Sequence, residues 1–466
     1  MSGELGARSA WWVGTLVCVL VVMAIAAFAA GFGGASPEAV AQSRGGSVHV
    51  GVASCSGSTC HGRQEGNGKV VRQDELLRWQ EDSSPTGAHS RAFRILSEPR
   101  SVAIAQRLGL GSAASSPTCL GCHADPAAAG RGPRFQLSDG VGCEACHGGA
   151  QNWLASHYAV GASHQGNVAR GMIPLENARA RAEVCLDCHF GSASSGQFVN
   201  HRIMAAGHPR ISFELDLFTT LQQHHDEDGD YARRKGRSNG VKTWAVGQAV
   251  ALDRALTLFQ NANLGQEGIF PEFYFFDCHT CHRRISDDAG ARPGKLANPG
   301  RPIPAGMPAF NDENMIMLSA AVRAAAPGLS ARFEADSRAF HAAIAQGRPA
   351  ALKAAAKLGA TAEALATSFN QASFDRAQTF AIIDSIASGA TAARYTDYEG
   401  SVQAVMATDT LLNALVNAGY VGAGSAGTIR ADINRAYQAV RDPNDYRPLD
   451  FRASLARAAS AIRALR

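Results

Sequence analysis

Ten cysteines of this chain form five local pairs, and a histidine directly follows the second cysteine of every pair. In chain order we number these groups sites 1 to 5, as Cys55–Cys60–His61, Cys119–Cys122–His123, Cys143–Cys146–His147, Cys185–Cys188–His189 and Cys278–Cys281–His282. An eleventh cysteine, Cys18, lies in an apolar N-terminal stretch. The fold must therefore hold each of the five Cys–Cys–His groups together and leave it accessible to the molecule that binds there.

Sites 2 to 5 have the spacing Cys-x-x-Cys-His, which predicts covalent attachment of haem c. The two thiols reach the two vinyl groups as thioethers, and the adjacent histidine then lies beneath the iron as its proximal ligand. Site 1 is a longer variant with Ser56-Gly57-Ser58-Thr59 between its cysteines. We expect it to bind a haem as well, which gives five covalently bound haems.

Zinc and disulfides are the competing interpretations. Cys119, Cys122, Cys143 and Cys146 fit the spacing of a zinc ribbon. Neither zinc nor a disulfide explains a histidine after every pair, because the whole chain of 466 residues has 15 histidines. At site 1 the alternative is a disulfide loop beside an ordinary histidine.

An iron with two axial protein ligands is suited to electron transfer, so each haem needs a second ligand. Ten histidines lie outside the proximal positions, namely His49, His89, His157, His164, His201, His208, His224, His225, His279 and His341. Nine of the ten precede residue 285, in the part of the chain that holds the motifs. His341 lies in the cysteine-free part, where we expect a structural role.

The remaining sequence predicts a mainly α fold with little regular strand. We expect a multihaem cytochrome c domain over 42–284, a Pro/Gly-rich linker over 285–309 and an α-helical bundle over 310–466. Within the first domain, 174–184 and 244–259 have the character of helices, the former with Pro174 in its first turn. The apolar stripe of the last helix is the clearest, formed by Phe451, Leu455, Ala458, Ile462 and Leu465.

Residues 1–41 have the features of an export segment. No charge occurs between Ser9 and Pro37, and Ala39-Val40-Ala41 offers a small-residue cleavage site. The apolar run over 11–31 is long enough to span a bilayer, so it is either a cleaved signal peptide or a retained anchor in the cytoplasmic membrane. Both alternatives predict a periplasmic protein, soluble or anchored.

The formal charge of +4 is no argument for nucleic acid. Each haem brings two propionates, so five haems would shift the total to about −1 when oxidised and about −6 when reduced. We therefore expect redox proteins as partners and no nucleic acid.

Several stretches resemble the multihaem superfamily of cytochrome c-554 and hydroxylamine oxidoreductase. They are Asp139-Gly140-Val141-Gly142-Cys143-Glu144-Ala145-Cys146-His147-Gly148 with His157 after it, Trp79 followed by His89, Ala206-Gly207-His208-Pro209-Arg210, and Phe270-Pro271-Glu272-Phe273 leading into Asp277-Cys278. The resemblance covers 50–285 and implies a mostly helical fold around closely packed haem pairs with bis-histidine ligation. The implied distal ligands are His89, His157, His201 and His208, with His225 as the fifth candidate.

The chain also departs from that superfamily. The cytochrome c-554 type has four haems, whereas this chain has five motifs and an added bundle. It has no Cys-x-x-Cys-Lys motif, and no tyrosine matches the cross-linking residue of hydroxylamine oxidoreductase. We therefore predict an electron carrier of a respiratory chain, without catalytic residues.

Two further interpretations remain open from the sequence. In the first, one five-coordinate haem reduces a small nitrogen or sulfur oxyanion, or nitric oxide. In the second, the C-terminal bundle serves homo-oligomerisation or docking.

Overall fold

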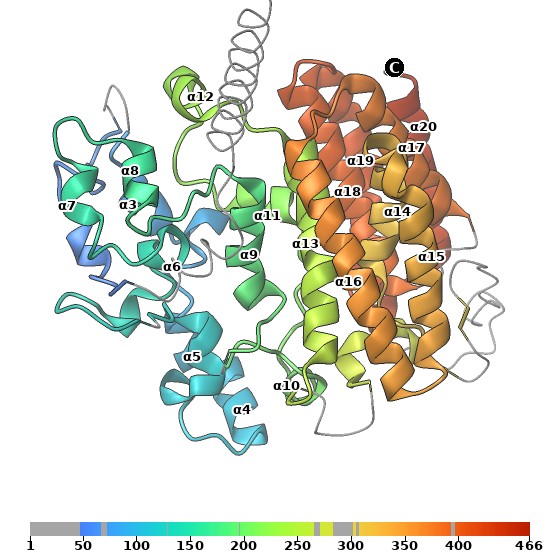
Figure 1. The fold of residues 1–466 in the computed structure, drawn as a ribbon, viewed down its shortest axis with the longest axis horizontal. Coiled ribbons are helices and arrows are strands. Elements are labelled where there is room, and N and C mark those ends of the chain that lie inside the picture. Colours follow the sequence, from blue (N-terminus) through green and yellow to red (C-terminus); the bar gives the residue numbers. More distant parts are fainter. Residues whose placement is uncertain are drawn as a thin grey trace, which may run out of the picture.

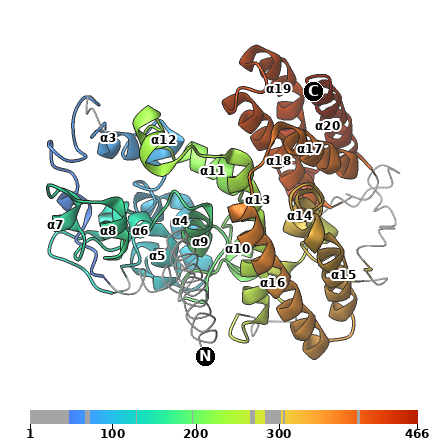
Figure 2. The same ribbon diagram turned by 45° about the horizontal axis from the view of Figure 1, so that its top comes forward.

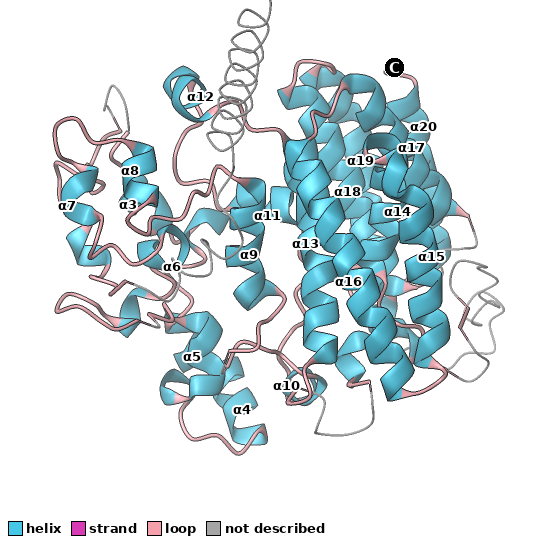
Figure 3. Ribbon diagram, viewed as in Figure 1, coloured by secondary structure: helices cyan, strands magenta, loops and turns pink. Residues whose placement is uncertain are grey.

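The computed structural model describes residues 47–66, 72–127, 129–194, 196–264, 271–282, 302–303, 307–392 and 397–466. These residues form α-helices, short 3₁₀ helices and loops, with two isolated β-bridges in place of a sheet (Figure 3). The predicted mainly α fold is thus confirmed. The export segment over 1–41, the anchor over 11–31 and most of the linker over 285–309 lie outside the described residues. Among the helices that are described, none combines the length and apolar character needed to cross a membrane.

The part of the chain with the first four motifs consists of short helices joined by long loops (Figure 1). Its helices are α3 (Glu75–Trp79), α4 (Pro99–Arg107), α5 (Pro117–His123), α6 (Cys143–His147), α7 (Leu154–His157), α8 (His164–Val168), α9 (Ala178–His189), α10 (His201–Ala205), α11 (Leu215–Leu221) and α12 (Gly229–Lys235). Helices this short are marginal in water unless their side chains pack against something. The buried apolar clusters around α4 to α8 are small, so these helices depend on a further packing partner.

Longer helices form a bundle on the other side of the molecule (Figures 1 and 2). They are α13 (Gly240–Gln260), α14 (Glu313–Ala325), α15 (Pro327–Ile344), α16 (Arg348–Gln371), α17 (Arg376–Thr391), α18 (Tyr398–Asn417), α19 (Ala423–Ala439) and α20 (Pro448–Arg463). On α20 the predicted stripe is buried at Phe451, Leu455, Ala458 and Ile462. Leu465 follows the helix and is half-buried.

Helix α13 belongs to the bundle, although it precedes the predicted linker. It packs along α16 and also contacts α9, α14 and α18 (Figure 1). Fifteen of its 21 residues are buried, among them Trp244 and Leu256, as expected of a helix that is apolar on all sides. One apolar core extends from Ala178 on α9 to the last helix. The predicted division between 284 and 310 therefore cuts through a shared core.

The two ends of the predicted linker also meet. Phe276 and Phe310 form an antiparallel bridge, the Asp277 amide donates to the Ala309 carbonyl (2.9 Å), and the Asn311 amide donates to the Phe275 carbonyl (2.8 Å). Site 5 is thereby attached to the start of the bundle.

Side-chain caps set the starts of the helices that the sequence predicted. Helix α9 begins at Ala178 because the Asn177 carboxamide accepts hydrogen bonds from the amides of Arg179 (2.9 Å) and Ala180 (3.4 Å). Pro174 therefore lies outside the helix, and the start predicted there was wrong. Asn239 caps α13 through the Lys242 amide (3.0 Å), so this helix begins before the predicted residue 244.

A shortened protein tests the shared core. In a chain that ends at Pro308, α13 loses α14, α16 and α18. Each large apolar side chain that becomes exposed costs about 1.5–3 kcal/mol, so several of them exceed the 5–15 kcal/mol stability of a typical domain. We expect an insoluble or protease-sensitive protein, measured by soluble yield and by the rate of limited proteolysis. Removal of residues 464–466 alone is the control. A soluble truncated protein with all five haems would contradict the shared core.

Candidate functional site

Each of the five motif histidines faces one histidine from outside the motifs. The pairs and the distances between their ring centres are His61–His157 (6.2 Å), His123–His208 (6.2 Å), His147–His224 (6.3 Å), His189–His89 (5.9 Å) and His282–His201 (6.2 Å). Two imidazoles that bind one metal ion from opposite sides, through metal–nitrogen bonds of about 2 Å, have ring centres roughly 6 Å apart. The spacing of each pair therefore fits one iron between the two rings.

Four of the five facing histidines are among the candidates named from the sequence: His89, His157, His201 and His208 each lie opposite a motif histidine. At site 3 the facing histidine is not the candidate His225 but the residue before it.

The ring that faces His147 is that of His224, whereas His225 lies 5.2 Å from His224 and 6.0 Å from Tyr231. The side chains of two adjacent residues point in different directions, so only one of the two histidines can face the motif. A sequence without a regular element at this position does not reveal which one points toward the motif.

The other histidines outside the motifs have partners of a different kind. His49 pairs with Asp125 (2.8 Å) and His164 with Glu176 (2.6 Å). The ring of His279 bonds to the Pro443 carbonyl (2.9 Å), and Nε2 of His341 lies 3.2 Å from the Asp312 carboxylate. These contacts join parts of the fold, so the four rings are structural.

The motifs lie at the ends of helices or in tight turns. Helices α5, α6 and α9 each end on the motif histidine, and η7 (Cys278–Thr280) begins site 5. On a helix, residues three apart share a face, so both thiols of a Cys-x-x-Cys point to one side.

The competing interpretations find no support in this geometry. All ten motif cysteines are free thiols, so the Cys55–Cys60 disulfide is not formed. Within the described ranges, no three His, Cys, Asp or Glu side chains converge as a zinc site would require.

Burial keeps most of these imidazoles neutral. It lowers the pKa of His189 to about 4 and lowers the pKa values of His89, His157, His208 and His224 as well. A neutral imidazole has a free lone pair on one nitrogen, which is the form that binds a metal ion.

Backbone carbonyls orient several of the rings. The Nδ1 atoms bond to carbonyl oxygens at His123 (Ala92, 2.9 Å), His208 (Pro209, 2.8 Å) and His224 (Gln222, 3.0 Å). A carbonyl only accepts hydrogen bonds, so Nδ1 carries the proton and Nε2 is free for a metal ion.

Sites 1 and 4 differ in the groups around the proximal ring. His61 Nδ1 lies 3.0 Å from the Glu75 carboxylate, and this hydrogen bond raises the pKa of His61. His189 Nδ1 is buried without a hydrogen-bond partner, and its ring packs against Phe213 (5.1 Å) and Phe218 (5.2 Å). A carboxylate makes an imidazole a stronger electron donor, so site 1 should hold a lower redox potential than site 4. Glu75 lies 14 residues from its partner, so no local sequence pattern indicated this contact.

Replacing Glu75→Gln tests this difference. The variant loses a charge-assisted hydrogen bond, worth about 1.5–3 kcal/mol, that favours the more positive, oxidised centre. We expect a spectroelectrochemical titration to show a higher redox potential for one haem. The increase should correspond to at most that free energy for the one electron transferred, and the haem content should stay unchanged. Asp82→Asn, which removes an exposed carboxylate paired with Arg94, is the control. A titration curve identical to that of the unmodified protein would contradict the assigned role of Glu75.

A second carboxylate that the sequence analysis missed holds site 3 in place. Glu144, inside the Cys-Glu-Ala-Cys-His motif, is 3% exposed and accepts hydrogen bonds from the amides of Val50 (2.8 Å), Gly51 (2.7 Å) and Ala150 (2.7 Å). It thereby ties α6 to the segment before site 1. The motif position of Glu144 was visible in the sequence, but its partners were not.

Neighbouring motifs touch each other through their cysteines. Cys122 Sγ lies 3.9 Å from the Cys188 carbonyl oxygen, and Cys188 Sγ lies 3.7 Å from the Gly121 carbonyl oxygen. Gly121 is required here, since a Cβ atom would lie 2.6 Å from the Gly196 backbone. Sites 2 and 4 are therefore adjacent.

Two further contacts extend the series. The thiols of Cys55 and Cys143 are close enough for each to shift the pKa of the other, so sites 1 and 3 are adjacent. Cys146 is close enough to Cys188 to affect its pKa, so site 3 also neighbours site 4.

Site 5 joins this series through two contacts. Arg210, two residues after His208 of site 2, lies with Nη1 3.8 Å from Cys278 Sγ. The Tyr274 hydroxyl donates to the carbonyl of Phe190 (3.2 Å), the residue that follows His189 of site 4.

Paired thiols beside a proximal histidine, with a second imidazole opposite it, define a c-type cytochrome that carries more than one haem. Such a protein binds haem c covalently and transfers electrons. Residues 54–148, which include sites 1 to 3, match the family of cytochrome c554 and c-prime. The match supports the assignment of the chain to the multihaem c-type cytochromes. No curated protein and no solved structure matches the chain significantly.

Proposed function

We propose that this chain is an exported pentahaem cytochrome that passes electrons between redox partners of a respiratory chain. The observation that carries the proposal is the set of five facing histidine pairs, each beside its own pair of thiols. The match over 54–148 and the residues quoted above support membership of the cytochrome c-554 and hydroxylamine oxidoreductase superfamily. Haem c, when bound, supplies an iron that accepts and releases one electron at a time.

The protein's own residues limit the structural rearrangement that accompanies this electron exchange. At each site the two cysteines would hold the group covalently, and the two facing imidazoles would bind its iron. Because burial lowers the pKa of several of these rings and backbone carbonyls orient some of them, such ligands need not move when the charge changes. Little rearrangement means a small barrier to electron transfer.

The contacts between motifs support a relay with sites 1 and 5 at its ends, in which site 5 is next to both site 2 and site 4. Site 1 neighbours site 3, site 3 neighbours site 4, and site 4 neighbours both sites 2 and 5. Cys60 of site 1 and Cys281 of site 5 are exposed, whereas the other eight cysteines are half-buried. We therefore infer that electrons enter and leave at sites 1 and 5.

The reductase alternative requires one haem iron with a coordination position that is free for a substrate. In the described structure, all five motif histidines face a second imidazole. The geometry thus favours the electron carrier. The apolar stretch over 11–31 and the cleavage site after it support export, with the cytoplasmic membrane as a further contact if the stretch is retained.

Haem content is the first test. We expect five haems per chain from a pyridine haemochrome assay, and an intact mass that includes five covalent haem additions. The Cys55→Ser/Cys60→Ser variant should lose one of them, because it removes both thiols that would form thioether bonds at site 1. If the unmodified protein has four haems, site 1 is not a haem site.

Axial ligation is the second test, and the chain contains its own control. His224→Ala should open one axial position at site 3 and give a high-spin ferric signal from about one fifth of the haem. His225→Ala removes the neighbouring ring and should leave all haems low-spin. Electron paramagnetic resonance distinguishes the two. A high-spin signal from H225A but not from H224A would reverse the assignment, and one from the unmodified protein would favour the reductase.

A further inference from the structure

A buried cluster of charges lies where site 5 meets the bundle. Arg210 reaches two carboxylates, with Nη1 3.3 Å from Glu399 Oε1 and Nη2 3.7 Å from Glu313 Oε1. The Glu399 and Glu313 side chains are 1% and 4% exposed. Arg210 also approaches Cys278 Sγ (3.8 Å), so the cluster touches the haem-attachment motif itself. Two buried carboxylates thus share one guanidinium group.

The other groups around the pair do not supply a second cation in the described part of the cluster. They come from the site 5 segment, the start of α14 and the start of α18, and are Glu272, Tyr274, Asp277, Cys278, Asn311, Tyr398, Gln403 and Asp442. The Asp277 carboxylate accepts hydrogen bonds from the amides of Tyr398 (2.9 Å) and Glu399 (3.0 Å). The cluster therefore holds more negative than positive charge when its carboxylates are ionised.

Hydrogen bonding stabilises this excess charge only in part. The Asn311 side-chain carboxamide donates to Glu313 Oε1 (3.1 Å), whereas Glu313 Oε2 and both carboxylate oxygens of Glu399 are buried without a hydrogen-bond partner. Glu399 also contacts the Cys278 thiol, but a thioether at this position has no proton to donate. Burial, together with the charge of Glu399, raises the pKa of Glu313 to about 7.

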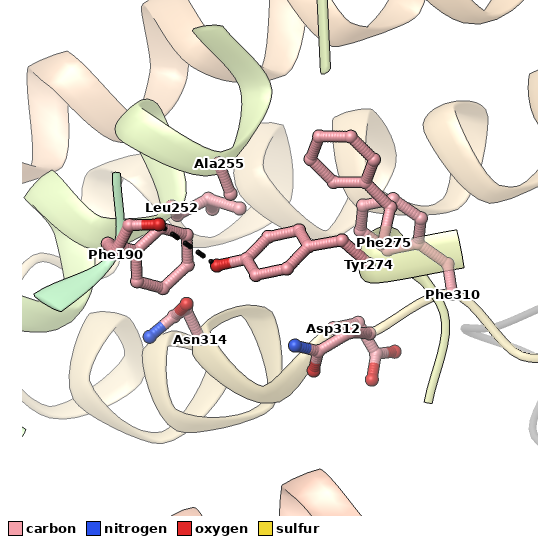
Figure 4. Close-up of a pocket in the computed structure, with 9 residues that line it drawn as sticks. Phe190, Leu252, Ala255, Tyr274, Phe275, Phe310, Asp312 and Asn314 are labelled. Atoms are coloured by element: carbon pink, nitrogen blue, oxygen red, sulfur yellow. Dashed lines mark hydrogen bonds between the residues drawn. The ribbon is translucent and has the colours of Figure 1, made fainter. Parts of the chain in front are cut away.

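A small cavity next to the cluster has room for a proton carrier. Its volume of about 10 Å³ is at the lower limit for holding one water molecule. Asn311, Asp312, Asn314 and Tyr274 supply polar groups to its wall (Figure 4). Asn311 also donates a hydrogen bond to Glu313. The side chain of Asn311 would therefore connect a water molecule in the cavity to the carboxylate pair.

We propose that Glu313 and Glu399 form a proton-binding site that takes up one proton when an electron reaches site 5. The inference rests on the proposed function, in which site 5 holds a haem. One electron from the relay converts ferric to ferrous iron, and one proton from solvent converts one carboxylate to a carboxylic acid. No other bond changes. The added electron makes a poorly solvated region more negative, and the proton restores its charge.

The coupling gives the redox potential of site 5 a defined pH dependence. At acid pH the shared proton is bound in both oxidation states, so the potential is constant. Above about neutral pH the oxidised protein has released the proton, and reduction then requires its uptake. The potential should fall by about 59 mV for each tenfold decrease in proton concentration.

The experiment is a spectroelectrochemical titration of the full-length protein over a pH series, for the unmodified chain and for Glu313→Gln and Glu399→Gln. We expect both variants to lose the pH-dependent part of one of the five potentials and to take up about one proton fewer on full reduction. Asp336→Asn on α15, where Asp336 is 2% exposed and accepts from the Thr361 hydroxyl (2.7 Å), is the matched control and should behave as the unmodified protein.

Unchanged pH dependence in both glutamine variants would overturn the proposal. If the variants do not fold, the reduced-minus-oxidised infrared spectrum of the unmodified protein decides. It should gain a band from a protonated carboxyl group on reduction, and the lack of such a band would also overturn the proposal. A tryptic peptide with unmodified Cys278 and Cys281 would instead disprove the haem at site 5, and with it the proposed function.

Discussion

The gap between facing imidazoles is the constraint on which the motif-bearing half of this molecule depends. Five pairs of rings are held 5.9–6.3 Å apart, too far to touch and close enough for one metal ion between them. Helices of four to twelve residues cannot bury enough apolar surface to hold such positions alone. A haem bound in each gap would supply that surface and would serve this half as its hydrophobic core. The bundle, with its long apolar helices, has a core made of side chains.

The sequence predicted well those features that local spacing determines. Thiols and proximal histidines follow from the motifs, and the last helix follows from the period of its apolar residues. The register of a loop and the partners of a carboxylate are not local. His224 and His225 are equivalent in the sequence, and only the folded chain turns one of them toward His147. Glu75, Glu144 and Arg210 likewise gain their roles from residues far away in the chain.

The boundary between the two halves shows a different limit of sequence reasoning. A run of prolines between 285 and 309 resembles a linker, and cysteines end just before it. The apolar surface of α13 is nevertheless buried by helices that follow the prolines. A composition rich in proline indicates where the chain is locally irregular. A domain boundary depends instead on which apolar surfaces are buried against each other. Site 5 lies on that matched surface, so the bundle forms part of its environment.

The contact between Cys122 and Cys188 has a consequence for biogenesis. Their thiols lie against each other's backbone, and Gly121 allows the Gly196 backbone to approach without room for a side chain. In the folded chain these contacts would restrict the access of an enzyme that forms thioether bonds. Haem at sites 2 and 4 would therefore be attached most readily to an open chain, before the two sites close over each other.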